Sequence, residues 1–329
     1  MCEKEYPMTP KTQESIDLKK AKSATITTII DNYIHLHLPV SDRVERAPLT
    51  RNNVRLPPLL AEHGFSVLLE VFENSGPHAI LMDFGISKIG VPNNLEVLEI
   101  DLDKIEGFVV SHGHHDHLGA IVEVLSSLSR KPRPVVVHPD AFITTRFHRF
   151  PDGKQAPIPS LKKGVIEKTG NEVIDGSSPV SLASGYAVAL GEIPRITEFE
   201  KGVATAYYEK EGYTHKDLIM DDKAIVLNIE SKGLVVVSGC AHSGIINTVR
   251  HAQKITGVDK IYCVMGGFHL IGAGGEPVEH TAWTIEEMKA LNPEVIVPCH
   301  CTGDKPTHEF EKAFPAAFVL NASGTKIHL

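Results

Sequence analysis

One stretch of the chain constrains its fold more than any other, because an apolar strand, a cluster of histidines and a helix follow one another without a linker. Residues 107–110 read GFVV, which predicts a buried strand, and residues 118–128 have the apolar spacing of a helix. Between them lies SHGHHDH, which contains the pattern His-x-His-x-Asp-His. A histidine-rich surface loop is the alternative interpretation, but the position between strand and helix favours a metal site.

The spacing within this pattern suits metal coordination. Residues two apart in an extended segment project to the same side, so His112 and His114 can bind one cation, whereas the turn that starts the helix directs Asp116 and His117 towards a second. Imidazoles with a carboxylate suit zinc, manganese or iron and differ from the cysteine-rich set of a closed structural zinc site. We therefore predict an open, catalytic pair of divalent metal ions, with zinc the first choice.

The rest of the chain alternates between short strands and helices. Strands are expected at residues 25–31, 65–72, 78–82, 135–138, 223–230, 234–238, 260–265, 295–298 and 317–320, and helices at residues 93–98, 101–105, 245–255 and 281–291. A long surface loop is expected at residues 39–58, which contain several Pro, Arg and Asn. An α/β fold with two packed sheets and helices outside would satisfy this order.

The expected domain organisation is simple. Residues 1–22 are polar and lack periodicity, which predicts an N-terminal tail, and residues 23–329 are expected to form a single domain. Within that domain, residues 139–220 are interrupted by turn motifs such as Pro-Asp-Gly and are expected to form a cap-like insertion over the site.

Composition limits the classes of function. The chain of 329 residues has 33 Lys and Arg against 41 Asp and Glu, so its net charge of −8 offers no basic field for nucleic acid or an anionic membrane. Apolar runs such as residues 224–229 are far shorter than the ~20 residues of a membrane-spanning helix. The N-terminus has no apolar signal region, so we expect a cytoplasmic protein. Five cysteines form no disulfide framework, whereas 18 histidines point to further metal ligands.

Two more residues and five more motifs lead to a family resemblance. Asp83 ends an expected strand in ILMDFG, and His300 follows a late strand in VPCHCTG; with the histidine pattern they resemble the metallo-β-lactamase superfamily. Residues 25–329 further resemble the branch named for the archaeal dihydropterin–ribofuranosylaminobenzene phosphate synthase, through the motifs AEHGFS (61–66), GEIPR (191–195), GCAHSG (239–244), GGFHL (266–270) and PCHCTG (298–303). The resemblance implies an αββα sandwich with metals at the sheet edge, Asp83 as a buried support of the ligand loop and His300 as the last ligand.

The chain departs from the superfamily pattern at two positions. Where a carboxylate that bridges the metals is expected after the hairpin, the sequence has Cys240. His242 or a Cys240 thiolate could replace it, and we favour His242 because a cysteine on an apolar strand is more often only packed. Where a mid-chain histidine is expected, the chain has Asp221 and Asp222, which are either ligands or a solvated turn. The predicted metal ligands are therefore His112, His114, Asp116, His117, His242 and His300.

Four residues are candidates for substrate binding, each with a plainer alternative. His269 follows a strand on the same edge and is either a contact or a packed histidine, and Arg195 could bind an anion or form an ordinary salt bridge. Glu62 and His63 could contact substrate or only support the site. Residues 146–150, RFHRF, suit an anionic ring-bearing substrate, although an ordinary half-buried helix is the alternative.

The functional hypothesis is a metal-dependent hydrolase of an anionic small molecule, such as a phosphoester or lactone. Asp116 would both bind a cation and orient the activated water. Two alternatives stay open: the resemblance allows a transferase that condenses a pterin with an aminobenzene riboside phosphate, and a non-catalytic metal-binding sensor is a third class. The sequence does not decide whether the chain forms a homo-oligomer.

Overall fold

The computed structural model describes residues 15–74, 76–272 and 275–329. The tail was expected over residues 1–22, and its residues 1–14 lie outside the described residues. Residues 20 and 21 form the short strand β1 (Lys20–Ala21), which pairs in parallel with β17 (Ala224–Ile229).

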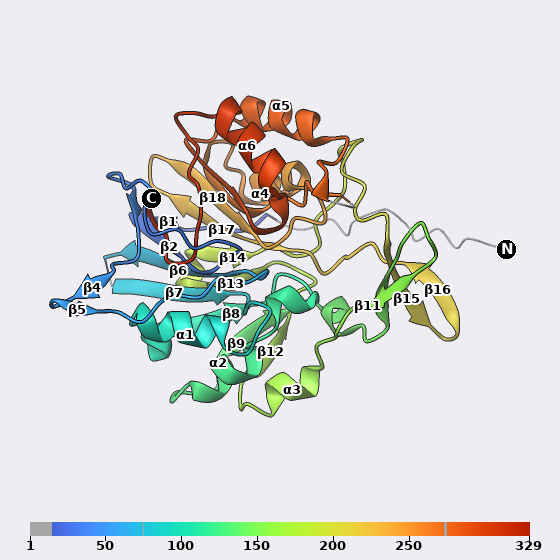
Figure 1. The fold of residues 1–329 in the computed structure, drawn as a ribbon, viewed down its shortest axis with the longest axis horizontal. Helices are drawn as coiled ribbons and strands as arrows, with labels where there is room; N and C mark the ends of the chain where they lie inside the picture. The colour runs from blue at the N-terminus through green and yellow to red at the C-terminus, as the bar shows by residue number, and fades with distance from the viewer. Residues whose placement is uncertain (1–14, 75, 273–274) are drawn as a thin grey trace.

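The first sheet comes mainly from the N-terminal half of the chain (Figure 1). Within the described residues it has eight strands in the order β12, β9, β8, β7, β6, β2, β21, β3. These are β2 (Ser23–Ile30), β3 (Val44–Glu45), β6 (Ser66–Glu73), β7 (Gly76–Met82), β8 (Ile105–Val109), β9 (Pro134–Val137), β12 (Glu172–Asp175) and β21 (Lys326–His328). Strands β7, β8, β9 and β12 are parallel to one another, so their carboxyl ends meet at one edge.

The second sheet packs against the first. Its path through the described part of the chain is β13, β14, β17, β18, β19, β20, with β1 added beside β17. The strands not yet defined are β13 (Val180–Leu182), β14 (Ala187–Ala189), β18 (Gly233–Ser238), β19 (Ile261–Gly267) and β20 (Val295–Cys299). Since β18, β19 and β20 are parallel, their carboxyl ends also share one edge.

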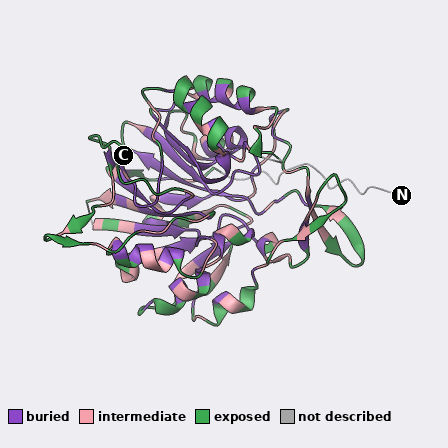
Figure 2. Ribbon diagram, in the orientation of Figure 1, coloured by how far each residue is buried: buried purple, intermediate pink, exposed green. Residues whose placement is uncertain are grey.

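Three apolar layers hold the sheets and helices together. Side chains alternate across each strand, so in β6 Val67 and Leu69 enter the core between the sheets whereas Leu68 faces the outer helices. The helices α1 (Gly90–Val97), α2 (Ile121–Ser127) and α3 (Lys163–Glu167) cover the first sheet, and α4 (Ile245–Thr256), α5 (Thr281–Leu291) and α6 (Asp304–Ala313) cover the second (Figure 1). Figure 2 shows buried residues concentrated in the strands, with exposed residues on the outer helical surfaces. The expected αββα sandwich is confirmed.

Some element predictions are wrong in detail. The helix expected over residues 101–105 is only a 3-10 turn (Leu102–Lys104), because β8 begins at Ile105. The strand expected at residues 317–320 makes a single bridge, between Phe318 and Ile296, beside β20. The last strand is instead β21, which lies between β2 and β3 in the first sheet, and the helix α6 was not expected. Within the expected loop 39–58, β3 adds to the first sheet and β4 (Thr50–Arg51) pairs with β5 (Val54–Arg55).

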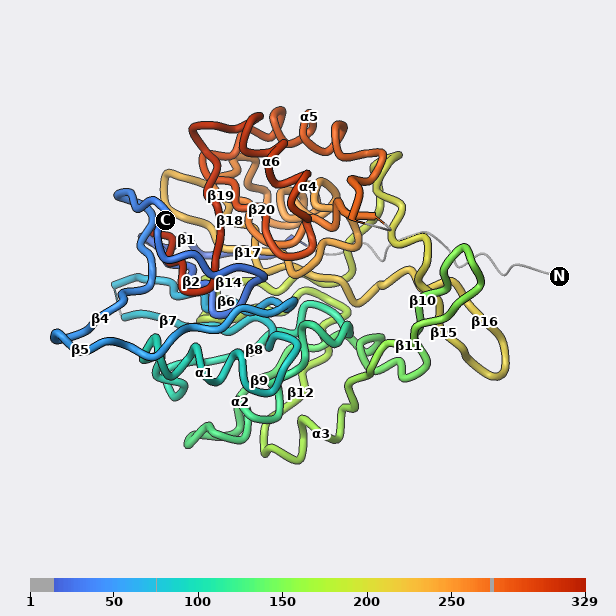
Figure 3. Tube along the Cα trace, in the orientation of Figure 1, coloured from blue at the N-terminus to red at the C-terminus, as the bar shows by residue number. Residues whose placement is uncertain are grey.

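The segment 139–220, expected as a cap, is divided between the sandwich and a separate small sheet. Its strands β12, β13 and β14 belong to the two main sheets. The remaining strands are β10 (Arg146–Arg149), β11 (Gln155–Pro157), β15 (Ala206–Lys210) and β16 (Tyr213–Lys216), which form a four-stranded antiparallel sheet in the order β11, β10, β15, β16. We call it the outer sheet, because it projects beyond one end of the sandwich (Figure 3). The helix considered for residues 146–150 is therefore strand β10.

No helix in the described ranges combines the length and the apolar character needed to cross a membrane.

Asn94 on α1 connects the fold to the loop that carries His63. Its amide nitrogen donates to the carbonyl oxygens of Ile29 at 2.7 Å and Leu60 at 2.8 Å, and its Oδ1 accepts from the Leu60 N–H at 2.8 Å. We expect Asn94→Ala to lower the free energy of unfolding by about 2–4 kcal/mol, because buried backbone groups lose their partners. Urea unfolding measures this, with Glu96→Ala on the exposed side of α1 as the control. Equal stability of the two variants would contradict the expectation.

Candidate metal centre

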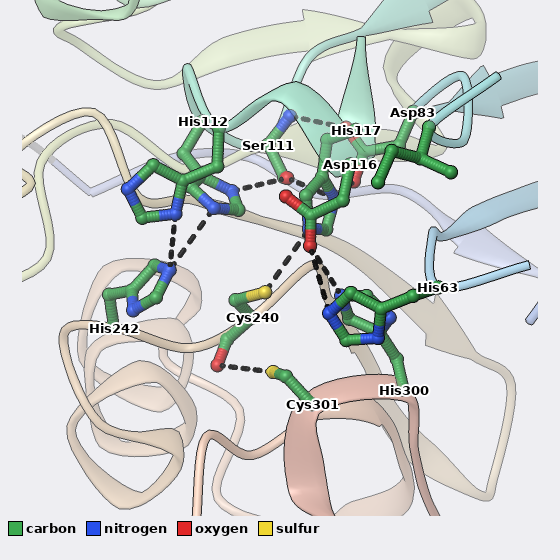
Figure 4. A network of polar contacts seen from close by, with 12 residues as sticks. His63, Asp83, Ser111, His112, Asp116, His117, Cys240, His242, His300 and Cys301 are labelled. Atoms are coloured by element: carbon green, nitrogen blue, oxygen red, sulfur yellow. Dashed lines mark hydrogen bonds and ion pairs between the residues drawn. The ribbon is translucent and has the colours of Figure 1, made fainter. Parts of the chain in front are cut away.

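Seven histidine, aspartate and cysteine side chains converge from three loops at one edge of the sandwich (Figure 4). The loop after β8 supplies four of them and the loop after β18 supplies Cys240 and His242. His300 follows β20 directly. Because β8 in one sheet and β18 and β20 in the other end at this edge, the fold brings together residues that are up to 188 positions apart, as His112 and His300 are.

The first donor group consists of His112, His114 and His242. The Nε2 atom of His242 lies 3.1 Å from His112 Nε2 and 3.1 Å from His114 Nδ1. Two ligand atoms bound tetrahedrally at ~2.0–2.1 Å from zinc would be about 3.3 Å apart, so the spacing fits one cation. Burial lowers the pKa of His114 to about 3 and the pKa values of His112 and His242 well below their usual range. All three imidazoles are thus neutral, the form that binds metals.

The second donor group consists of Asp116, His117, Cys240 and His300, whose ligand atoms all lie within 4.8 Å of one another. His117 Nε2 is 3.1 Å from Cys240 Sγ, and Asp116 Oδ2 is 3.4 Å from His300 Nε2. A set of imidazoles, one carboxylate and one thiol suits zinc or iron. The two groups adjoin, since the ring centroids of His112 and His117 are 4.3 Å apart. The geometry therefore offers places for two neighbouring cations.

Charge is distributed unevenly in the second group. Burial opposes a charge on His117, but Asp83 and Asp116 outweigh it and raise the pKa of His117 to about 9. Burial also opposes ionisation of Asp116, yet His117 and His300 hold the pKa of that carboxyl well below its usual range. The Asp116 side chain keeps 14% of its surface exposed, so the carboxylate is ionised and reachable from solvent.

Cys240 and His242 both face the centre, although the sequence analysis favoured His242 over Cys240. Ala241 between them has a φ of 52°, and this turn directs the two side chains into different groups. His242 completes the histidine group, and Cys240 occupies the place beside Asp116 and His300 where the superfamily pattern expects a carboxylate. Spacing alone did not show this, because the backbone between the two residues is in a conformation that alanine rarely adopts.

Asp83 supports the ligand loop, as the resemblance implied. It is fully buried at the end of β7, its Oδ1 accepts from the Ser111 N–H at 2.7 Å, and its Oδ2 is 2.6 Å from His117 Nδ1. Because Nδ1 of His117 is held by the carboxylate, Nε2 is directed to the centre (Figure 4).

Asp221 and Asp222 are neither ligands in these groups nor a solvated turn, since both are buried and bind backbone N–H groups. Asp221 Oδ2 accepts from the Gly113 N–H at 2.6 Å, and Asp222 Oδ2 accepts from the Ser243 N–H at 2.8 Å. Each carboxylate therefore fixes a loop that carries ligands. Gly113 is needed at its position, because a Cβ there would lie 2.6 Å from an Arg146 nitrogen.

Two residues near the centre were not singled out by the sequence analysis. Asp31 directly follows β2 and accepts from the His300 N–H at 3.1 Å through Oδ1, so it holds the last ligand in place. Its only signal in the sequence was its position at the end of a strand. Cys301 lies in the PCHCTG motif and forms a third cluster of donor atoms with Cys240 and His269.

The four predicted substrate residues separate into two pairs. His63 stacks on His300 with ring centroids 5.1 Å apart, and its Nε2 is 3.7 Å from Asp116 Oδ2, so it lies at the rim of the centre. His269 is 4.3 Å from His242 between ring centroids. Glu62 instead accepts from the Ile86 and Ser87 N–H groups, which is the supporting role considered for it. Arg195 donates to the Leu218 carbonyl oxygen and to Met220 Sδ, and its side chain belongs to neither donor group.

Arg146 connects the outer sheet to the ligand loop, and its loss should be costly. It is buried between Asp217, 2.7 Å from its Nε, and Asp221, 2.5 Å from its Nη2. We expect Arg146→Ala to lower the free energy of unfolding by about 3–5 kcal/mol, because two buried carboxylates lose their partner. Chemical denaturation measures this. Arg149→Ala on the other face of β10 is the control and should cost less than about 1 kcal/mol; similar losses would contradict this account.

Single substitutions should separate the two donor groups. We expect His242→Ala to lower the affinity for one zinc ion and Cys240→Ser to lower the affinity for another. Each affinity should fall by at least roughly a hundredfold, because each variant removes one direct ligand. Zinc titration against a chelator, with metal content measured by mass spectrometry, reports the number and affinity of the ions.

His138→Ala is the matched control for this titration. Its Nδ1 accepts from the Asp140 N–H at 3.0 Å, outside both groups. Zinc binding that is unchanged in both site variants, or lost from both groups together in each, would contradict two separable groups.

Comparisons with known proteins show which proteins the chain is similar to. No family model matches the chain. A 7,8-dihydropterin-6-methyl-4-(β-D-ribofuranosyl)-aminobenzene-5'-phosphate synthase from Methanocaldococcus jannaschii is 33% identical over 265 residues, which cover 79% of this chain and 88% of that protein. An uncharacterized protein of the same organism is 30% identical over 258 residues, covering 77% of this chain and 89% of its own length.

Among solved structures, Tm1679, described as a metal-dependent hydrolase of the beta-lactamase superfamily, has the same fold. It superposes with a TM-score of 0.69 at 22% identity, covering 92% of this chain and 98% of its own. The identity with the synthase extends over most of both chains. The chain therefore belongs to the family of the 7,8-dihydropterin-6-methyl-4-(β-D-ribofuranosyl)-aminobenzene-5'-phosphate synthase, and it has the metallo-β-lactamase fold.

Proposed function

We propose that this protein is a metal-dependent hydrolase that cleaves a small anionic molecule, a phosphoester or a lactone, with an activated water. The observation that carries the proposal is the adjacency of the two donor groups, of which the second includes the partly exposed carboxylate of Asp116. A structural zinc site is closed by four protein ligands, whereas the first group offers three. An open position beside a second cation suits catalysis.

Divalent cations in these groups would supply Lewis acidity and lower the pKa of a bound water towards neutrality. The chain's own residues supply the rest. The ionised carboxylate of Asp116 lies beside His117 and could orient a water molecule by accepting a hydrogen bond from it, and Asp83 fixes His117 in place. His63, at the rim, has Nε2 3.7 Å from Asp116 Oδ2 and is placed to donate a hydrogen bond to the substrate or leaving group.

A second candidate function is favoured by the 33% identity with the synthase. In a condensation of that kind, a pterin derivative and a ribofuranosylaminobenzene phosphate would bind together, and no water would react. The same donor groups would then hold the anionic part of one substrate. Both candidates require a metal centre and an anionic substrate, and they differ in the nucleophile.

Turnover assays decide between the candidates. We expect zinc- or manganese-loaded protein to hydrolyse bis(4-nitrophenyl) phosphate or the lactone dihydrocoumarin, and His112→Ala to lower kcat/KM by at least roughly a hundredfold, because it removes a metal ligand. The release of nitrophenolate, or the acid formed from the lactone, measures the rate. His138→Ala, outside both donor groups, should keep wild-type activity.

The opposite outcomes are equally informative. Product that forms only when pterin diphosphate and the aminobenzene riboside phosphate are supplied together would replace hydrolysis by condensation. Protein that binds zinc, manganese or iron but turns over none of these compounds would overturn both enzymatic proposals in favour of a sensor.

A further inference from the structure

One face of the outer sheet carries aromatic rings that lead away from the metal centre. Side chains alternate along β10, so Arg146 and His148 share a face with Phe150, which directly follows the strand. The register places Tyr208 of β15 opposite Arg146, and His215 of β16 opposite Tyr208. The face thus includes the rings of His148, Phe150, Tyr208 and His215, and we call it the ring face.

The ring face begins beside the metal centre. His148 lies 6.2 Å from His114 between ring centroids, and its own Nδ1 is held by Thr205 Oγ1 at 3.0 Å. The ring centroid of Phe150 lies 6.3 Å from that of His148, and Phe150 is 40% exposed.

The opposite face of the outer sheet differs, because its rings are already covered. The Arg149 guanidinium lies 5.0 Å from the Tyr207 ring and 5.4 Å from the Phe147 ring. The Lys216 ammonium lies 4.7 Å from the Tyr207 ring. These cation–π contacts occupy the aromatic surfaces of that face, whereas on the ring face the half-buried His148 and the exposed Phe150 lie towards the metal ligand His114.

We propose that the ring face is a substrate subsite that binds a planar ring, with His148 and Phe150 as specificity-determining residues, while the anionic group of the same molecule binds at the metal centre. The inference rests on the proposed function, since it assigns the substrate a flat aromatic portion. Offset stacking on two rings about 6 Å apart favours a planar group over an aliphatic one. The buried ion pairs of Arg146 fix β10 to the ligand loop, so the distance between ring and anionic group is set by the fold.

Binding of non-hydrolysable phosphonates tests this subsite without any turnover. Titration calorimetry with zinc-loaded protein would compare 1-naphthylphosphonate, which has a planar ring, with methylphosphonate, which has none. We expect tighter binding of the naphthyl compound, and His148→Ala and Phe150→Ala should each weaken it roughly five- to tenfold. Neither variant should change the affinity for methylphosphonate, because neither residue belongs to the donor groups.

Gln155→Ala is the matched control, since Gln155 is exposed and pairs with Arg149, on the other face of the outer sheet. It should leave both affinities unchanged. Equal affinity of wild-type protein for the two phosphonates, or naphthyl binding that is unchanged in both ring-face variants, would overturn the subsite. So would an equal loss for both phosphonates, which would indicate damage to the metal centre. Ring-dependent binding in a protein that hydrolyses no phosphoester or lactone would support the subsite and refute only the proposed function.

Discussion

Buried carboxylates that bind the backbone of the ligand loops are the interaction on which this site depends. Asp83 holds Ser111, Asp221 holds Gly113 and Asp31 holds His300, in each case through the backbone N–H. A fully buried carboxylate must keep its hydrogen-bond donors, because an unpaired buried charge costs several kcal/mol. A ligand loop therefore cannot move without leaving an acid unpaired. These contacts preorganise the ligand loops, which reduces the ordering that binding of a cation requires.

The same principle joins the outer sheet to the centre. Asp221 binds the Gly113 N–H on one side and the Arg146 guanidinium on the other, so one buried carboxylate connects the histidine loop to strand β10. Motion of the outer sheet relative to the sandwich would break the buried ion pair between Arg146 and Asp221. The ring face is thus a rigid extension of the metal centre, and substrate size would be set by the fold.

The sequence predicted what is local and missed what is distant. The strand, the histidine pattern and the helix around residues 107–128 could be predicted because the apolar periodicity and the histidine spacing that indicate them lie in one continuous stretch of sequence. His300 was found only through a family resemblance. The contact of Asp31 with His300 joins residues 269 positions apart, and the pairing of β21 with β2 is equally remote, so neither leaves a periodic signal. The roles of Asp221 and Cys240 depended on backbone turns that composition does not encode.

The replacement of a carboxylate by Cys240 has an electrostatic consequence. The first donor group contains only neutral imidazoles, and the second contains one carboxylate and one thiol. Burial and the neighbouring Cys301 raise the pKa of Cys240, so the thiol would lose its proton only to a bound cation. Even then, one carboxylate and one thiolate would offset half the charge of two divalent ions. On these ligands alone the centre would stay locally cationic within a chain of net charge −8, which would favour the anionic substrate that we propose.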